Sequence, residues 1–216
     1  MRQAAWSKRT DVLVRTVAAR CRPRLQLELG HWVEDNPRFR TFVEANADKV
    51  RKKLSADDEE ARLDVRAELL VAHRLLADRR FEVSFEAYGA GKVGPDLSAA
   101  FRVNQRFNLE VTRLRGAPEV AKLANVIGAK LRQMPQGMPN GLVLTGESLE
   151  LTAPLLADAA HILRERSTGE MVARYLRLSG VFALDESDGV TFWANREARQ
   201  PLPDAIVTAV TTCLAA

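Results

Sequence analysis

The sequence predicts an α/β fold in which helices flank a mixed central sheet. Apolar residues recur at helical spacing after Ser55, short alternating or continuous apolar runs follow from residue 81 onward, and a second helical stretch separates two of those runs. Hydrophobic residues make up 46% of the 216 residues and charged residues 28%, so the chain can bury a core. We therefore expect one good-sized domain with a small appendage.

The predicted appendage, residues 1–54, is basic and mainly helical. It holds thirteen Lys or Arg and six Asp or Glu, a net charge of +7, whereas residues 55–216 hold 19 basic and 22 acidic residues, a net charge of −3. A basic segment on a mildly acidic body is compatible with contact to a phosphate backbone, and a solvated helix face explains the same charges. The residues expected to touch nucleic acid here are Lys49, Arg51, Lys52 and Lys53.

Prolines and an asparagine indicate where the elements of this appendage begin and end. Residues 8–22 have a helical pattern that ends before a proline, and residues 25–29 alternate leucine with polar residues, which predicts a short strand. Asn36 and Pro37 are typical of a helix start, with asparagine as cap and proline at the first helical position. We expect that helix to run to residue 54.

The body, residues 55–216, is expected to begin with a long helix that opens at Ser55, with Asp58 as a capping-box-like partner. That helix ends around residues 79–80, and residues 81–85 alternate as a strand. The later expected elements are strands around Asp96 and Glu110, a helix over 118–134, a strand over 141–145, a helical stretch over 152–176, a hairpin of 181–184 with 190–193, and a closing helix over 203–214.

Several classes of protein are disfavoured. No apolar run approaches ~20 residues, the N-terminus lacks a secretory stretch, and two cysteines at opposite ends make no disulfide framework. The three histidines are scattered, and His73 is expected to be a packed, hydrogen-bonded residue. We expect a cytoplasmic protein without membrane contact.

Two acids stand inside segments that otherwise have the composition of strands. Asp96 follows Val-Gly-Pro, and Glu110 interrupts Phe-Asn-Leu-Glu-Val-Thr. Because an unpaired buried carboxylate is costly, strand interiors rarely hold one without a partner. Two such acids on neighbouring strands could hold a divalent cation, which is the basis of many sites that cleave phosphodiesters.

The element order αβββαβ, with Gly-Pro-Asp ending at Asp96 and Glu-x-Thr running from Glu110 to Thr112, resembles the PD-(D/E)xK nuclease superfamily over roughly residues 55–146. The resemblance implies a restriction-endonuclease-like core and a Mg²⁺- or Mn²⁺-dependent endonuclease, acting on DNA by fold analogy. It also implies metal ligation by Asp96, Glu110 and the carbonyl of Val111.

A helix glutamate often joins the metal site in this superfamily, and Glu68 is the candidate. It lies about 70° from the centre of its helix's apolar stripe, on the flank of the buried face. The alternative is a surface glutamate paired with a nearby arginine.

The departure from the family pattern is Thr112, where the superfamily has the lysine that stabilises the attacking water and the phosphate charge. Lys130 lies about 60° from the centre of its own helix's apolar stripe and could replace that charge. With Gln133 it forms a Lys-x-x-Gln element like the one some branches carry. The alternative is a snorkelling lysine. Lys122 and Lys92 are weaker substitutes, and Lys92 could also touch phosphate.

Three hypotheses therefore stand. The first is a nuclease that uses Glu68, Asp96, Glu110, Lys130 and Gln133. The second, favoured by Thr112, is a degenerate member that binds DNA or a protein partner without cleavage. The third is an αβ domain whose strand acids make structural ion pairs. The hairpin over 181–194 and the last helix are either a homodimer surface or the far side of the sheet.

Overall fold

The computed structural model describes residues 6–88, 94–146, 151–185 and 189–216. Contacts divide the chain into two compact units, with the boundary between Arg79 and Arg80. The expected boundary lay after residue 54. It differs because the helix that follows packs on the helices before it and belongs with them.

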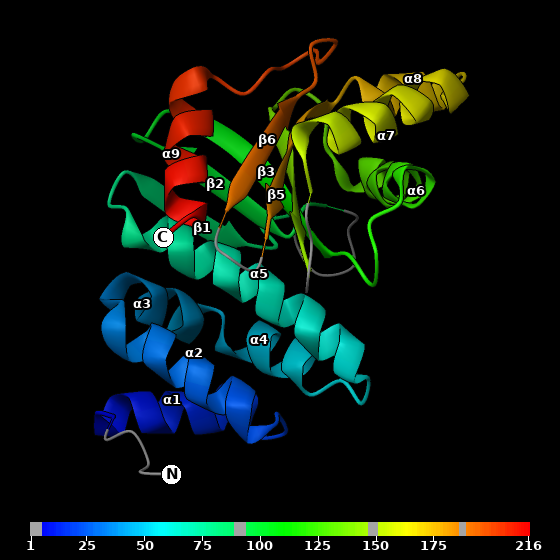
Figure 1. Cartoon of the computed structure of the whole chain (residues 1–216). Helices are drawn as coiled ribbons and strands as arrows, with labels where there is room; N and C mark the ends of the chain where they lie inside the picture. Colours follow the sequence, from blue (N-terminus) through cyan, green and yellow to red (C-terminus); the bar gives the residue numbers. More distant parts are fainter. Residues whose placement is uncertain (1–5, 89–93, 147–150, 186–188) are drawn as a thin grey trace. The chain divides into compact units, whose positions relative to one another are not determined.

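The first unit is helical throughout its described part (Figure 1). Its elements are α1 (Lys8–Ala18), α2 (Pro23–Asp35), α3 (Pro37–Ala45), α4 (Ala47–Leu54) and α5 (Glu59–Ala77). The expected strand over residues 25–29 is wrong, because these residues lie in α2. Leu25 and Leu29 are buried one helical turn apart, which fits helical spacing as well as the alternation fits a strand.

The helix starts in this unit follow capping chemistry. Asn36 accepts hydrogen bonds from the backbone N–H groups of Arg38 and Phe39, both at 3.1 Å, so the predicted cap is confirmed. The single helix expected up to residue 54 is divided at Asn46 into α3 and α4. Helix α5 begins later than expected, with Asp58 itself as the cap.

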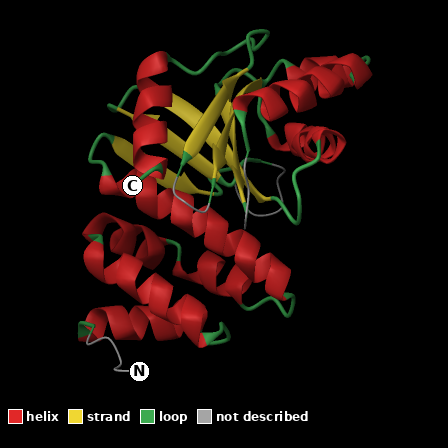
Figure 2. Cartoon of the chain, viewed as in Figure 1, coloured by secondary structure: helices red, strands yellow, loops and turns green. Residues whose placement is uncertain are grey.

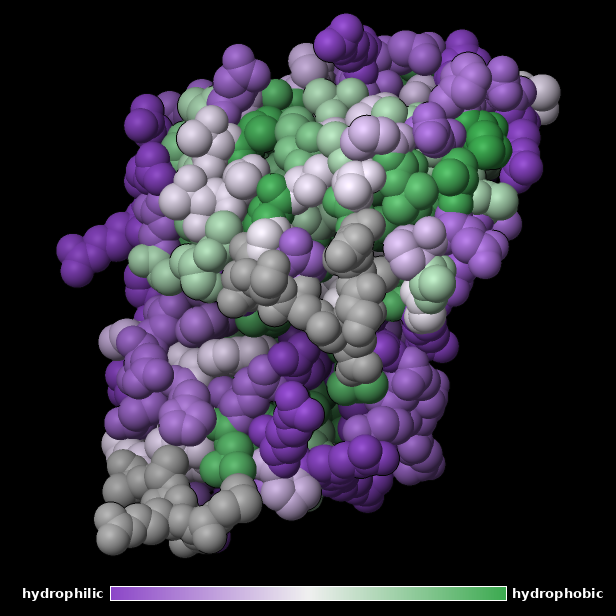
Figure 3. Space-filling model, viewed as in Figure 1, coloured by the Kyte–Doolittle hydropathy of each residue, from purple (hydrophilic) through white to green (hydrophobic). Residues whose placement is uncertain are grey.

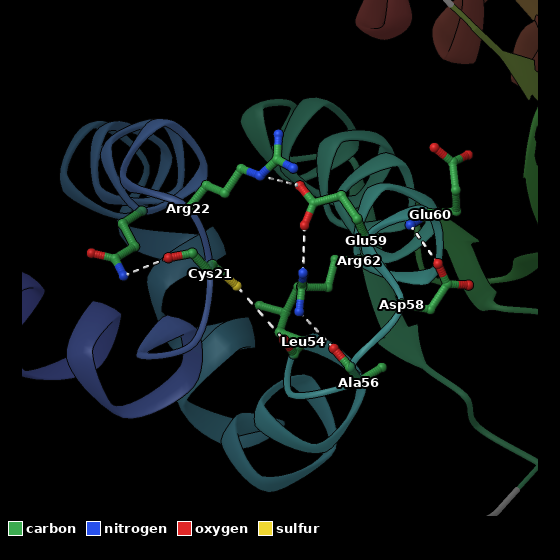
Figure 4. A network of polar contacts seen from close by, with 9 residues as sticks. Cys21, Arg22, Leu54, Ala56, Asp58, Glu59, Glu60 and Arg62 are labelled. Atoms are coloured by element: carbon green, nitrogen blue, oxygen red, sulfur yellow. Dashed lines mark hydrogen bonds and ion pairs between the residues drawn. The ribbon is translucent and has the colours of Figure 1, made fainter.

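Ion pairs tie the start of α5 to the turn between α1 and α2 (Figure 4). Glu59 accepts from Arg62 at 2.5 Å and from Arg22 at 3.2 Å, and Arg62 also donates to the carbonyl of Ala56 at 2.7 Å. In these ion pairs the acidic and basic side chains lie within hydrogen-bonding distance of each other. Because the partners are partly exposed, each pair adds little stability.

The second unit is built on a six-stranded mixed sheet whose strands lie in chain order. The strands are β1 (Phe81–Phe85), β2 (Leu97–Phe101), β3 (Gln105–Arg113), β4 (Asn140–Thr145), β5 (Leu178–Leu184) and β6 (Val190–Ala194). The first three form an antiparallel meander, β3, β4 and β5 are parallel, and β6 is antiparallel to β5. The prediction of an α/β fold with a mixed sheet is confirmed.

Helices cover both faces of this sheet (Figure 2). They are α6 (Val120–Lys130), which continues as the 3₁₀ turn η1 (Leu131–Gln133), then α7 (Ala153–Arg166), α8 (Glu170–Tyr175) and α9 (Asp204–Leu214). Leu142 and Leu144 of β4 join the core under α6 and α7, while Gly141 faces Leu202, which precedes α9. Among the described helices, none is both long and apolar enough to cross a bilayer.

The sheet face under α6 and α7 changes character from strand to strand. On β4 and β5 it is apolar, and a continuous cluster of leucine, isoleucine, valine and alanine side chains fills it. Apolar side chains mixed with polar ones also reach the surface over β6 and α7 (Figure 3). On β2 and β3 the same face is polar, and this is where the predicted acids lie.

Candidate active site

Asp96 and Glu110 face each other at the end of β2. Leu97 is paired with Leu109, so the next step of the antiparallel register sets Asp96 opposite Glu110. Side chains alternate along a strand, so both acids project from the same face, where the charge of Asp96 acts on the carboxyl group of Glu110. The sequence-based prediction that the two acids meet on neighbouring strands agrees with this geometry.

Glu110 is held in its protonated form at neutral pH. Its side chain is 1% exposed, and this burial, together with the negative charge of Asp96, raises the pKa of Glu110 to about 8. The ammonium of Lys130 acts in the opposite direction, but it does not outweigh the two effects that favour the proton. Burial and the charge of Asp96 therefore favour the protonated form of Glu110 beside the Lys130 side chain.

Lys130 and Gln133 reach the same carboxyl group from the helix side. Lys130 Nζ donates to Glu110 Oε1 at 2.8 Å, and the Lys130 side chain is 26% exposed. The hydrogen-bonding pattern orients Gln133 with its amide nitrogen toward Glu110, where it donates to Oε2 at 2.9 Å. The two residues are three positions apart across the α6–η1 junction, so one helix face presents both.

The Gly-Pro-Asp segment frees a backbone oxygen beside these carboxyls. Val111 N–H donates to Asp96 Oδ2 at 2.9 Å. One further step along the register sets Val111 opposite Pro95, which has no N–H to give to the ladder. The carbonyl of Val111 points to the same side as its N–H and receives no ladder hydrogen bond from Pro95. Three oxygen-bearing groups thus gather at this strand end.

A polar ladder below the acids was missed by the sequence analysis. Ser98 Oγ donates to Asn108 Oδ1 at 2.8 Å, and Asn108 Nδ2 donates to Asn140 Oδ1 at 3.0 Å. Asn108 and Asn140 are almost completely buried, and Asn140 also donates to backbone carbonyls of neighbouring turns. The available signal was Asn108, two residues before Glu110 in an apolar strand and so on the same face. The ladder ties β2, β3 and β4 together beneath the site.

The other predicted site residues lie elsewhere. Glu68 belongs to the first unit, on α5, where its buried carboxylate accepts from Lys53 Nζ at 2.7 Å. Its role as a metal ligand stays a prediction. The ammonium of Lys53 is thereby engaged within this unit, and Arg51 pairs with Asp48 at 2.7 Å.

Lys52 is exposed on α4, Lys49 is half-buried there, and Lys92 lies outside the described residues. Thr112 is half-buried on β3. Lys122 Nζ donates to the carbonyl of Arg115 on the loop before α6. Of the lysines weighed as replacements for the missing charge and described in the structure, Lys130 is therefore the one in contact with Glu110.

The donor set at Asp96, Glu110 and Val111 suits a hard divalent cation. Carboxylate and carbonyl oxygens are the ligands that Mg²⁺ and Mn²⁺ prefer, and Mg²⁺ retains several waters. Within the described ranges, no group of three or more His, Cys, Asp or Glu side chains is placed to hold a metal. The fit is therefore to an ion that takes two carboxylates, a backbone oxygen and water.

In comparisons with known proteins, no family model, no curated protein and no solved structure matches the chain significantly.

Proposed function

We propose that this chain is a metal-dependent nuclease of the PD-(D/E)xK type that hydrolyses phosphodiester bonds in DNA. The observation that carries the proposal is the convergence of Asp96, Glu110 and Lys130 on one face of the sheet, with Lys130 Nζ 2.8 Å from Glu110. The αβββαβ order also supports it, because α5, β1, β2, β3, α6 and β4 follow one another along the chain. A restriction-endonuclease-like core is part of this proposal.

Each residue has a role that its position supports. Asp96, Glu110 and the carbonyl of Val111 would hold Mg²⁺ or Mn²⁺. The bound ion supplies a water of lowered pKa and neutralises charge on the phosphate. Lys130 provides the positive charge that Thr112 lacks, and Gln133 orients Glu110 through its amide. Lys92 and the cations of α4 remain proposed contacts to the nucleic-acid backbone.

Metal binding must displace the proton on Glu110, since a protonated carboxyl group is a poor ligand. The pKa of about 8 means that metal competes with a proton throughout the neutral range. Apparent metal affinity should therefore rise with pH, by up to about tenfold per pH unit below pH 8. Activity is expected to follow the same rise until Glu110 is fully ionised.

The test is cleavage of plasmid and short duplex DNA in Mg²⁺ or Mn²⁺. The wild type is compared with an Asp96→Asn/Glu110→Gln variant, which preserves shape, and with Glu119→Gln, which alters an exposed acid before α6. Cleavage by the wild type and by Glu119→Gln, with none by the double variant, supports the nuclease. Equal background from all three rejects it.

One outcome of the same experiment selects the second candidate. If no variant cuts DNA and all of them retard it in a mobility assay, the chain is a degenerate member that binds without cleavage. The feature that favours this candidate is Thr112, which cannot supply a charge. If the chain also binds no DNA, the ion-pair hypothesis remains.

A further inference from the structure

The turn between β2 and β3 holds an apolar side chain in water at a conformational cost. Arg102 and Val103 have φ angles of 49° and 72°, in the left-handed region that favours glycine. A β-branched residue is especially disfavoured there. Val103 is 72% exposed, and in the described part of the chain it shares the class of exposed large hydrophobic residues with Val12 alone. Neither local conformation nor burial explains a valine at this tip.

The tip is also basic. The guanidinium groups of Arg102 and Arg80 each lie 5.2 Å from the centre of the buried Phe101 ring, which leaves them at the base of the turn. Arg106 is exposed a few residues further along β3, and the register places Glu82 in the same cross-strand row. Three arginines against one glutamate give this end of the sheet a net charge of +2.

An apolar tip among arginines matches one kind of surface, the minor groove of duplex DNA. Architectural proteins insert an aliphatic side chain between base steps there, while arginines follow the groove and its phosphates. A protein partner would require a larger apolar area than one valine. Single-strand binding relies on exposed aromatic platforms, and Phe101 is 1% exposed beneath its arginines.

The spacing to the candidate site fits the same duplex. Glu110 lies five residue steps along β3 from Gln105, where the strand begins. At ~3.4 Å per residue this is about 17 Å, which corresponds to roughly five base pairs along the helix axis. The tip can therefore lie in the groove of the duplex whose phosphate reaches Glu110.

We infer that the β2–β3 turn is a minor-groove wedge, with Val103 inserted at the base edges and Arg102 and Arg106 on the flanking phosphates. The inference deepens the proposed function, on which it rests for the class of substrate. It implies that the chain binds duplex DNA rather than single-stranded DNA.

The decisive variant is Val103→Gly, because structure and binding respond in opposite directions. Glycine removes the strain at φ 72°, so the melting temperature should rise by about 2–4 °C. The wedge is lost, so affinity for a short A·T-rich duplex should fall about tenfold. Affinity for the matching single strand should not change. Fluorescence anisotropy in EDTA measures both affinities without cleavage.

Charge gives the second arm. Val103→Asp should abolish duplex binding, whereas Val12→Asp, at the other exposed valine, should leave it unchanged. A minor-groove ligand such as netropsin should compete with the wild-type protein for the duplex. It should not weaken the residual duplex binding of Val103→Gly.

The inference is overturned if Val103→Gly binds duplex as the wild type does, if it weakens single-strand binding equally, or if duplex RNA binds better than DNA. Cleavage in Mg²⁺ is scored separately. Wedge-dependent binding without cleavage removes the nuclease proposal alone, and cleavage by Val103→Gly with unchanged duplex affinity removes the wedge alone.

Discussion

The two units bury titratable groups in opposite ways. In the first, His73 is stacked on Trp32 at 5.5 Å between ring centres and meets Phe39 edge-on at 5.2 Å. Burial lowers the pKa of His73, so the imidazole is neutral and behaves as part of an aromatic core. In the second, Glu110 is buried against another acid, Asp96, and keeps its proton.

The two buried groups differ in what surrounds them. A histidine that becomes neutral inside an aromatic cluster completes a core, although the buried Nδ1 of His73 has no hydrogen-bond partner among the described residues. Two acids that face each other on one strand end oppose folding unless a proton, a lysine or a cation intervenes. The two buried glutamates extend the contrast. Glu68 and Glu110 meet lysines at 2.7 and 2.8 Å, and at Glu110 the charge of Asp96 adds to burial in raising the pKa.

The largest expected effect that sharpens this comparison is on cleavage. Under the proposed function, Lys130→Ala removes the positive charge that stands in for the missing lysine, so the cleavage rate should fall about 10²–10³-fold. Mg²⁺ binding should persist, because the oxygen ligands remain. Lys122→Ala, on the same helix but bonded to the Arg115 carbonyl, is the matched control and should cleave normally. Equal activity of the two variants would remove Lys130 from the mechanism.

The next effect is on the stability of the second unit. Glu110 has an ordinary pKa of 4.5 when unfolded and about 8 when folded, so the folded state holds the extra proton between these values. Glu110 therefore lowers the free energy of unfolding progressively as pH rises from about 4.5 to 8, by up to ~1.4 kcal/mol per pH unit. Glu110→Gln should lack this slope.

Urea unfolding across that pH range measures the slope, with Glu119→Gln as the control for an exposed acid. If wild type and Glu110→Gln show parallel stability curves, Glu110 is ionised in the folded chain, and the contrast between the two units fails.

The sequence predicted the chemical groups of the site better than the polar residues that hold the strands beneath it. The meeting of Asp96 with Glu110 was predicted from two acids in strand-like segments, because a period of two fixes which face each occupies. Lys130 followed from helix geometry together with the resemblance to a Lys-x-x-Gln element and the absence of a lysine at position 112. The Asn108–Asn140 contact was not predicted, because the pairing of β3 with β4 depends on a crossover whose register no local pattern sets.

The errors in the first unit have a different cause. Leucines at 25, 27 and 29 satisfy strand alternation and helix spacing at once, and tertiary packing decided for the helix. The break at Asn46 and the membership of α5 in this unit also depend on packing between helices, which single residues do not encode.

The smallest effect concerns His73 and has the opposite sign in pH. Its folded pKa lies below the ordinary value of 6.5, chiefly through burial and then through the nearby charge of Arg74. The stability it contributes is present above pH 6.5 and is lost as pH falls through the folded pKa, by at most ~1.4 kcal/mol per pH unit. His73→Phe keeps the ring contacts and should reduce this loss of stability below pH 6.5, which we call the acid limb of the stability curve.

Trp32 reports on the first unit because it stacks on His73, so fluorescence should be followed in a chain whose two other tryptophans are phenylalanine. His161→Gln, at an exposed histidine on α7, is the control and should leave the acid limb in place. An acid limb that survives His73→Phe would mean that His73 titrates normally in the fold. Acid would then destabilise the first unit through other groups, and the opposite pH responses would no longer separate a packed base from a paired acid.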